Sequence, residues 1–127
     1  MLNYLIVFLG AGFGGAFRHG VNLLGLRLGL TEFPFATFFI NVSGSLIMGL
    51  AAGYFAFKLQ HPWAQHLRLF MTTGILGGYT TFSTFSLEAV LLFERGAVLY
   101  SVLYAVGSVI LGILGLVAGL ALMRTLS

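Results

Sequence analysis

The ten residues GGYTTFSTFS, Gly77 to Ser86, interrupt a strongly apolar sequence and decide how the chain is built. They contain two adjacent glycines, five Ser and Thr hydroxyl groups and two phenylalanines three positions apart. Glycine has poor helix propensity and a flexible backbone, so this stretch predicts a break in a helix. Within a membrane, such a break is tolerated only where it is buried in protein or lines an aqueous space. The stretch is therefore either a kink whose freed backbone groups bond to its own hydroxyl groups or part of a functional site.

The composition of the whole chain is that of a membrane protein. The 127 residues are 59% hydrophobic and 7% charged, with a mean hydropathy of +1.04. A soluble domain carries about 25% charged residues, which it needs for a solvated face. The six basic residues are spread along the chain and form no patch, so nucleic acid is not an expected partner. Because cysteine is absent, disulfides and thiolate metal sites are excluded.

Four apolar windows are long enough to cross a bilayer, which takes roughly 20 mostly apolar residues. The predicted spans are 2–24, 33–57, 67–93 and 97–123. Because the connections are short, we expect residues 1–127 to form a single four-helix transmembrane domain of the all-α class. The glycine pair follows the start of the third span by ten residues, so we expect the break near the middle of the membrane. The N-terminal MLNYLIVFLG has no basic region, which indicates a retained span, not a cleaved signal.

Basic residues are almost equally divided between the two sides of the predicted bundle. Both termini and the loop 58–66 share one side, with Lys58, Arg68 and Arg124. The other side has Arg27 and Arg95. Orientation follows the Lys and Arg bias of short loops, and three against two is a weak bias. Either weak signals set one orientation, or copies insert both ways and pair antiparallel.

Glycines recur at four-residue spacing in three of the predicted spans. The pairs are Gly10 and Gly14, Gly49 and Gly53, and Gly115 and Gly119. Pairs with this spacing allow helix backbones to approach closely. They predict close packing either within one chain or between copies of it.

Strongly polar side chains lie inside two of the predicted spans, where they usually face a cavity or a partner. In the second span, Thr37, Asn41 and Ser45 share one helix face. The Asn41 amide has two donors that need partners, so it either joins two helices or lines a polar pathway. In the first span, Arg18 either snorkels to the membrane surface or adds to such a pathway.

The residues after the break place aromatic rings and hydroxyl groups together. Phe82, Phe85 and Glu88 are three positions apart, so a resumed helix puts them on one face. Phenylalanines at this spacing usually pack or face lipid, although their electropositive ring edges can also contact an anion. Ser83 and Thr84 add hydroxyl donors between the rings. Glu88 is expected in a vestibule near the membrane surface, with no catalytic role.

The run GGYTTFSTFS, the asparagine in the preceding span and GAFR at 15–18 resemble the bacterial fluoride channel family (Fluc, also called CrcB). The resemblance covers essentially the whole chain, and its core GxTTFSTF is highly specific. It implies an antiparallel, dual-topology homodimer in the bacterial inner membrane, surrounded by lipid. Its two pores would passively export fluoride from the cytoplasm and so reduce fluoride toxicity. It also implies a structural sodium ion at the dimer interface.

The resemblance also assigns roles to individual residues. The backbone carbonyls of Gly77 and Thr80 of each subunit would hold the sodium ion. The ring edges of Phe82 and Phe85 would contact fluoride. The other pore positions would be Thr37, Asn41, Ser83, Thr84, Tyr104 and Ser108. Arg18 matches the first-span arginine of the family.

Two features depart from the family pattern. Tyr79 stands where an aliphatic residue is expected, and INVSGS at 40–45 is more polar than the ANxGG of some members. Neither departure falls on the contacts that the resemblance implies.

The residues favour fluoride on physical grounds as well. Fluoride is small and strongly hydrated, so a selective pore must replace its water shell with fixed donors. Amide, hydroxyl and ring-edge donors bind it less tightly than a cationic side chain would, and conduction requires that the ion can leave.

Three other functions fit this sequence less well. A small proton-coupled exporter of organic cations would need a membrane-embedded carboxylate, and Glu88 is the one candidate. A packing subunit without transport activity would leave the helix break without a purpose. We expect no enzyme, because the sequence has no nucleophile–base pair and its three histidines are scattered.

Overall fold

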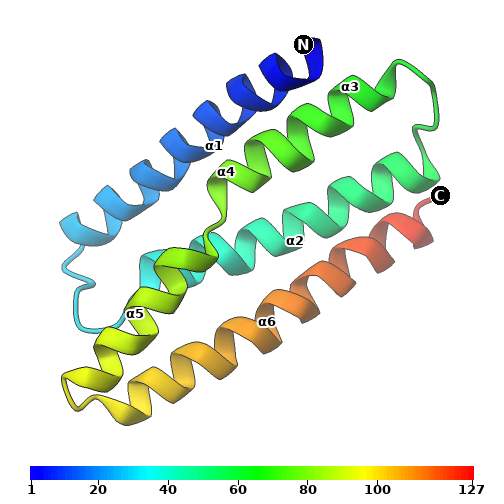
Figure 1. The fold of residues 1–127 in the computed structure, drawn as a ribbon. Helices are drawn as coiled ribbons and strands as arrows, with labels where there is room; N and C mark the ends of the chain where they lie inside the picture. Colours follow the sequence, from blue (N-terminus) through cyan, green and yellow to red (C-terminus); the bar gives the residue numbers. More distant parts are fainter.

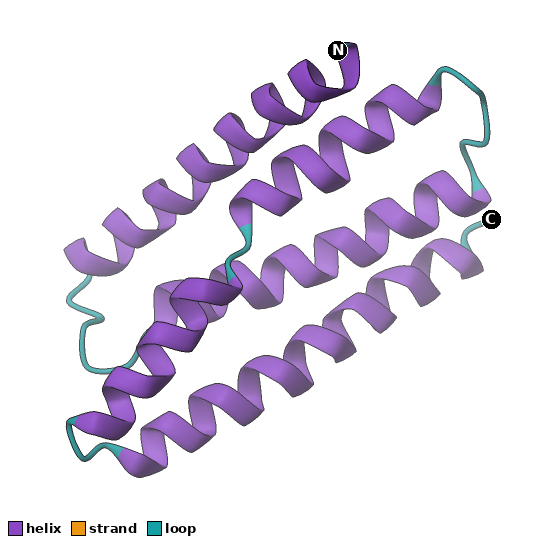
Figure 2. Ribbon diagram, viewed as in Figure 1, coloured by secondary structure: helices purple, strands orange, loops and turns teal.

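The computed structural model describes residues 1–127 and contains helices but no strand (Figures 1 and 2). Three helices are continuous: α1 (Leu2–Arg27), α2 (Phe35–Phe57) and α6 (Val98–Thr125). Between α2 and α6 the chain forms one long interrupted segment. It consists of α3 (Ala64–Arg68), the π-helical η1 (Leu69–Leu76), α4 (Gly77–Tyr79) and α5 (Phe82–Glu94). The predicted all-α class with four helical segments and a broken third one is confirmed.

Three of the four segments are long and apolar enough to cross a membrane. They are Phe35–Phe57, Ala64–Glu94 and Val98–Thr125. The first helix, α1, has 26 residues and is about 39 Å long, which exceeds the thickness of a bilayer core. Its second half contains Arg18, His19 and Asn22, which make it less apolar than the other three. Its membrane crossing stays a prediction.

The four segments run alternately up and down the bundle, so both termini lie at the same end (Figure 1). The loop between α2 and α3 lies at this end as well, while α5 and the α1–α2 connection reach the other end. Helix α2 packs chiefly on α6, and α1 packs chiefly on η1 and α4. The bundle is therefore two helix pairs, joined at the break.

The spaced glycines pack these helix pairs within the chain. A methyl carbon placed on Gly49 would lie 2.2 Å from the carbonyl oxygen of Leu116. One placed on Gly14 would lie 2.0 Å from that of Ile75. Side chains at these positions would force the backbones apart, so of the two alternatives above, packing within one chain accounts for these glycines.

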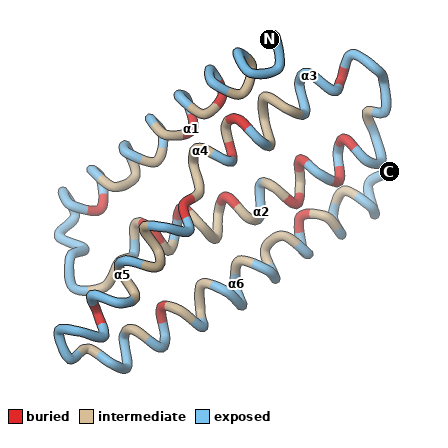
Figure 3. The backbone as a smooth tube through the Cα atoms, in the orientation of Figure 1, coloured by how far each residue is buried: buried red, intermediate tan, exposed pale blue.

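Burial is confined to the lines of contact between helices (Figure 3). Only 17 of the 127 residues are buried, and Ile40 and Tyr104 are the largest side chains that are completely so. Most large apolar side chains, such as Phe8 and Leu99, are exposed on the outer surface. Such a surface suits lipid or another subunit and does not suit water.

Candidate functional site

The break in the third segment lies at Thr80 and Thr81. Thr80 has φ −81° and ψ 157°, Thr81 has φ −152° and ψ 115°, and both are extended. The glycine pair, from which the sequence predicts the break, is itself helical: Gly77 and Gly78 belong to helix α4, so the prediction of unwinding at the glycines is wrong. Gly78 is needed for packing: a methyl carbon there would lie 2.5 Å from the carbonyl oxygen of Ala11 in α1.

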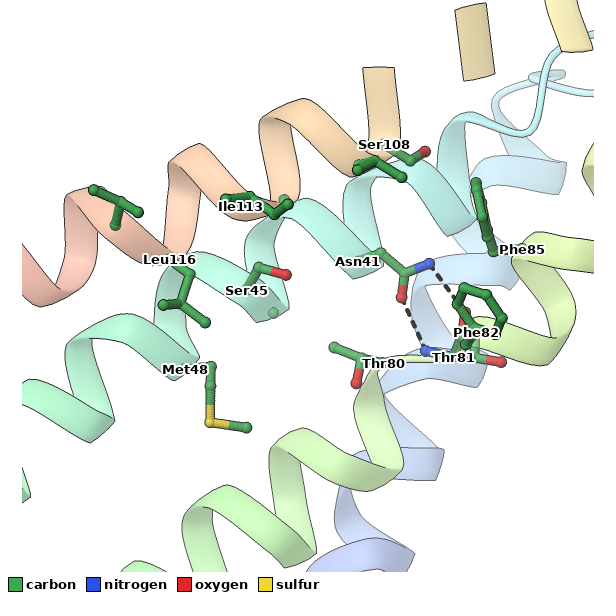
Figure 4. Close-up of a pocket in the computed structure, with 14 residues that line it drawn as sticks. Asn41, Ser45, Met48, Thr80, Thr81, Phe82, Phe85, Ser108, Ile113 and Leu116 are labelled. Carbon is green, nitrogen blue, oxygen red and sulfur yellow. Dashed lines mark hydrogen bonds between the residues drawn. The ribbon is translucent and has the colours of Figure 1, made fainter. Parts of the chain in front are cut away.

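Asn41 of α2 holds the break in place (Figure 4). Its Nδ2 donates to the Thr81 carbonyl at 3.0 Å, and the Thr81 N–H donates to its Oδ1 at 2.9 Å. The side-chain amide thus takes the place of the helical partners that an extended residue loses. Asn41 therefore joins two helices, and one N–H of its amide remains for another partner.

The same arrangement leaves the backbone carbonyls of Gly77 and Thr80, among others at the break, without their regular helical donors. The Thr81 N–H bonds to Asn41 and so does not bond to the carbonyl of Gly77. The Thr84 N–H bonds to the Thr81 Oγ1 at 3.2 Å, and so not to the carbonyl of Thr80. These are the two carbonyls that the family resemblance assigns to a sodium ion, and Gly77 is exposed on the subunit surface.

The two departures from the family pattern contact each other. The Tyr79 hydroxyl lies 3.0 Å from the Ser43 Oγ, which itself donates to the Ile40 carbonyl at 3.3 Å. Tyr79 is therefore the donor of this pair. Next to it, a methyl carbon on Gly44 would lie 2.3 Å from the Thr80 Cγ2, so only glycine allows the break to approach α2 this closely.

A cavity of about 460 Å³ opens beside the break, between α2, α5 and α6 (Figure 4). Four predicted pore residues line it: Asn41, Phe82, Phe85 and Ser108. The rings of Phe82 and Phe85 are 5.7 Å apart, and Phe82 is 78% exposed in the single subunit. The Ser108 Oγ is buried without a hydrogen-bond partner. A buried hydroxyl of this kind calls for a ligand or water.

A second cavity of about 430 Å³ is lined by residues of α1, the α1–α2 connection, α2 and α5. Thr37, Thr84 and Glu88 line it. The completely buried Tyr104 stands between the two cavities: its hydroxyl donates to the Glu88 Oε1 at 3.4 Å, and its ring is 5.1 Å from that of Phe85.

Besides Tyr104 and Gly77, two predicted site residues line neither cavity. Ser83 is exposed, and its Oγ lies 3.4 Å from the Thr81 Oγ1. Arg18 is partly exposed on α1 and lines neither cavity. Sequence reasoning overlooked the role of Thr81, whose hydroxyl caps α5, although threonine is a preferred residue at a helix N-terminus.

A helical membrane protein with a break in one span and polar groups facing cavities at that break is built as a channel or transporter. Residues 5–120 match the family described as CrcB-like protein, Camphor Resistance (CrcB), and the chain belongs to this family. It is a multi-pass protein of the bacterial inner membrane and not an enzyme.

Several similar proteins carry the name fluoride-specific ion channel FluC. That of Rhodopseudomonas palustris (strain BisB5) is 62% identical over 99% of this chain and 100% of its own length. That of Methylobacterium sp. (strain 4-46) is 61% identical over 98% of both chains. A more distant one, from Hyphomonas neptunium, is 45% identical over 98% of this chain and 97% of its own.

The contact between Tyr79 and Ser43 predicts a pairwise effect on stability. Tyr79→Phe is expected to lower the free energy of unfolding by about 1 kcal/mol, because it removes one partly buried hydrogen bond. Ser43→Ala is expected to cost a similar amount, and the double variant no more than about that, since both changes remove the same bond. Unfolding of the purified protein in mixed micelles measures all three.

Tyr54→Phe is the matched control, because Tyr54 of α2 is 41% exposed and its hydroxyl makes no hydrogen bond within the chain. It is expected to leave the stability unchanged. Losses from Tyr79→Phe and Ser43→Ala that simply add in the double variant would show that the two side chains do not interact.

Proposed function

We propose that this protein is a fluoride-selective channel that passively exports fluoride from the cytoplasm and so reduces fluoride toxicity. The observation that carries the proposal is the meeting of Asn41, Phe82, Phe85 and Ser108 around one cavity at the break. Its relatives carry the name fluoride-specific ion channel, which supports fluoride as the transported ion.

The donors around this cavity suit a small, strongly hydrated anion. The hydroxyl of Ser108 is free, the amide of Asn41 has one N–H to spare, and the edges of two phenylalanine rings are electropositive. No lysine or arginine lines the cavity. An anion would therefore exchange its water shell for several moderate donors and could leave again.

The proposed route continues past Phe85 and Tyr104 into the second cavity. There the hydroxyls of Thr37 and Thr84 extend the line of donors, and Glu88 marks the vestibule. A cation exporter would need Glu88 to alternate between a proton and a substrate. The bond from the Tyr104 hydroxyl to Glu88 and the names of the relatives both favour the channel instead.

The proposed assembly is an antiparallel homodimer of dual topology with a structural sodium ion at its centre. The nearly balanced loop charges support two orientations. The exposed Phe82 and Gly77 at mid-span support a second subunit that covers the break. The carbonyls of Gly77 and Thr80 fit sodium, because they are oxygen dipoles without regular helical donors at an unwound helix.

The decisive measurement of function is ion efflux from liposomes that contain the purified protein. We expect rapid fluoride efflux without chloride efflux. The double variant Phe82→Ile and Phe85→Ile is expected to abolish fluoride efflux, because isoleucine offers no electropositive ring edge.

Phe93→Ile is the matched control for this pair, since Phe93 lies on the same helix, is 61% exposed and lines neither cavity. The double variant must also keep the wild-type oligomeric state in gel filtration. Undiminished fluoride efflux from it would overturn the role of the rings, and cation uptake driven by a proton gradient would favour the exporter.

The sodium ion is tested separately by its removal. Protein purified and assayed with N-methylglucamine in place of sodium is expected to lose most of its fluoride efflux and to recover it when sodium is restored. Full activity without sodium would refute the sodium site and leave the fluoride channel standing.

Dual topology is tested by tags on the termini. In cells, a C-terminal tag is expected to be labelled from both sides of the membrane. The variant Arg27→Gln with Arg95→Gln leaves Lys58, Arg68 and Arg124 on one side against Arg18, inside the first span, so we expect it to insert in one orientation and lose fluoride efflux. Labelling of the wild-type tag from one side alone would exclude the antiparallel dimer.

A further inference from the structure

The connection between α2 and α3 forms a polar cup that the proposed fluoride route does not use. A cavity of about 430 Å³ lies at this connection, and four of its eight lining residues have polar side chains. The lining consists of Phe55, Leu59, Gln60, His61, Pro62, Ala64, Gln65 and Arg68. Phe55 and Ala64 are buried and form an apolar floor. The cup thus combines one guanidinium, one imidazole and two amides above an apolar base.

The charge of Arg68 is not neutralised by the surrounding protein. All three acidic side chains lie on α5 or on the α1–α2 connection, at the opposite end of the bundle (Figure 1). The other two basic side chains at the cup's end are engaged elsewhere. The Lys58 Nζ donates to the Leu126 carbonyl at 2.7 Å, and the Arg124 guanidinium lies 5.4 Å from the centre of the Phe57 ring. Arg68 is the one side-chain cation in the cup.

The position of the cup along the bundle is that of the lipid headgroups. It lies where the apolar segment Ala64–Glu94 begins. Trp63 is 57% exposed beside it, with its ring 5.7 Å from that of His61. Tryptophan is enriched at the membrane–water interface, where one part of its ring meets lipid and another meets water.

We propose that this cup binds the phosphate group of an anionic phospholipid. The Arg68 guanidinium presents several N–H donors in a plane that matches the oxygens of a phosphate. His61 and Gln65 supply further polar contacts, and one amide N–H of Gln60 is already bonded to the Ala56 carbonyl. The apolar floor accommodates the glycerol carbons. This site is independent of the fluoride route.

Trp63 is the only tryptophan of the chain, so its fluorescence reports on the cup alone. The full-length protein is reconstituted in phosphatidylcholine vesicles that contain a minor fraction of brominated lipid, either phosphatidylglycerol or phosphatidylcholine. We expect the brominated phosphatidylglycerol to quench Trp63 more strongly. One basic residue at the surface enriches anionic lipid about fivefold, equivalent to about 1 kcal/mol.

Arg68→Gln is expected to abolish this preference, and Arg68→Lys to retain part of it, because lysine keeps the positive charge without the planar guanidinium. Arg124→Gln is the matched control at the same membrane surface and is expected to keep the full preference. Equal quenching of the wild-type protein by both lipids would overturn the proposal. An undiminished preference in Arg68→Gln would overturn it as well.

An experiment with inorganic phosphate distinguishes a lipid phosphate from a free phosphate ion as the occupant of the cup. With a lipid as the natural occupant, millimolar phosphate in lipid-free micelles leaves the Trp63 emission unchanged, while the preference for phosphatidylglycerol in vesicles persists. A response to phosphate in micelles, combined with no preference between the lipids, would assign the cup to a free anion and reject the lipid.

Discussion

The double hydrogen bond between Asn41 and Thr81 is the interaction on which the rest of the structure depends. In a bilayer, each backbone group without a partner costs several kcal/mol, so a helix cannot open at mid-span without compensation. The Asn41 amide compensates both backbone groups of Thr81, and the Thr81 hydroxyl compensates the N–H of Thr84. The compensation is partial. It stabilises the extended chain but leaves the carbonyls of Gly77 and Thr80 for another partner.

This interaction requires that three segments approach more closely than side chains normally allow. Gly44 admits Thr80 to the surface of α2, and Gly78 admits α4 to the surface of α1. The break is thus held from both sides by contacts that involve almost no side-chain volume. A chain of 127 residues can therefore bring residues of α2, α5 and α6 to one cavity without a large core. Few residues of the single chain are buried, because glycines take the place of larger side chains at these contacts.

Much of this arrangement could be predicted from the sequence, because its signals are local. Apolar length predicted the helical segments, and the spacing of Phe82 and Phe85 predicted a shared face. The start of the break could not be predicted, since a glycine that loosens a helix and one that packs against a neighbour look the same in the sequence. Gly78 is a glycine that packs against a neighbouring helix. The partner of Asn41 was likewise beyond local reasoning, because Thr81 follows it by 40 residues.

The donors at the break differ in how much hydrogen-bonding capacity remains free, and this bears on the proposed passage of fluoride. The Asn41 amide is bonded to Thr81 with one N–H and its oxygen, and the Tyr104 hydroxyl is bonded to Glu88. The Ser108 hydroxyl has no partner. An anion that passes Phe85 therefore meets one free hydroxyl, that of Ser108, and two groups that are already bonded within the protein. The bonded groups can offer only part of their hydrogen-bonding strength, and the protein need not move to offer it. Binding of intermediate strength is what allows an ion with a tightly held water shell both to enter a pore and to leave it.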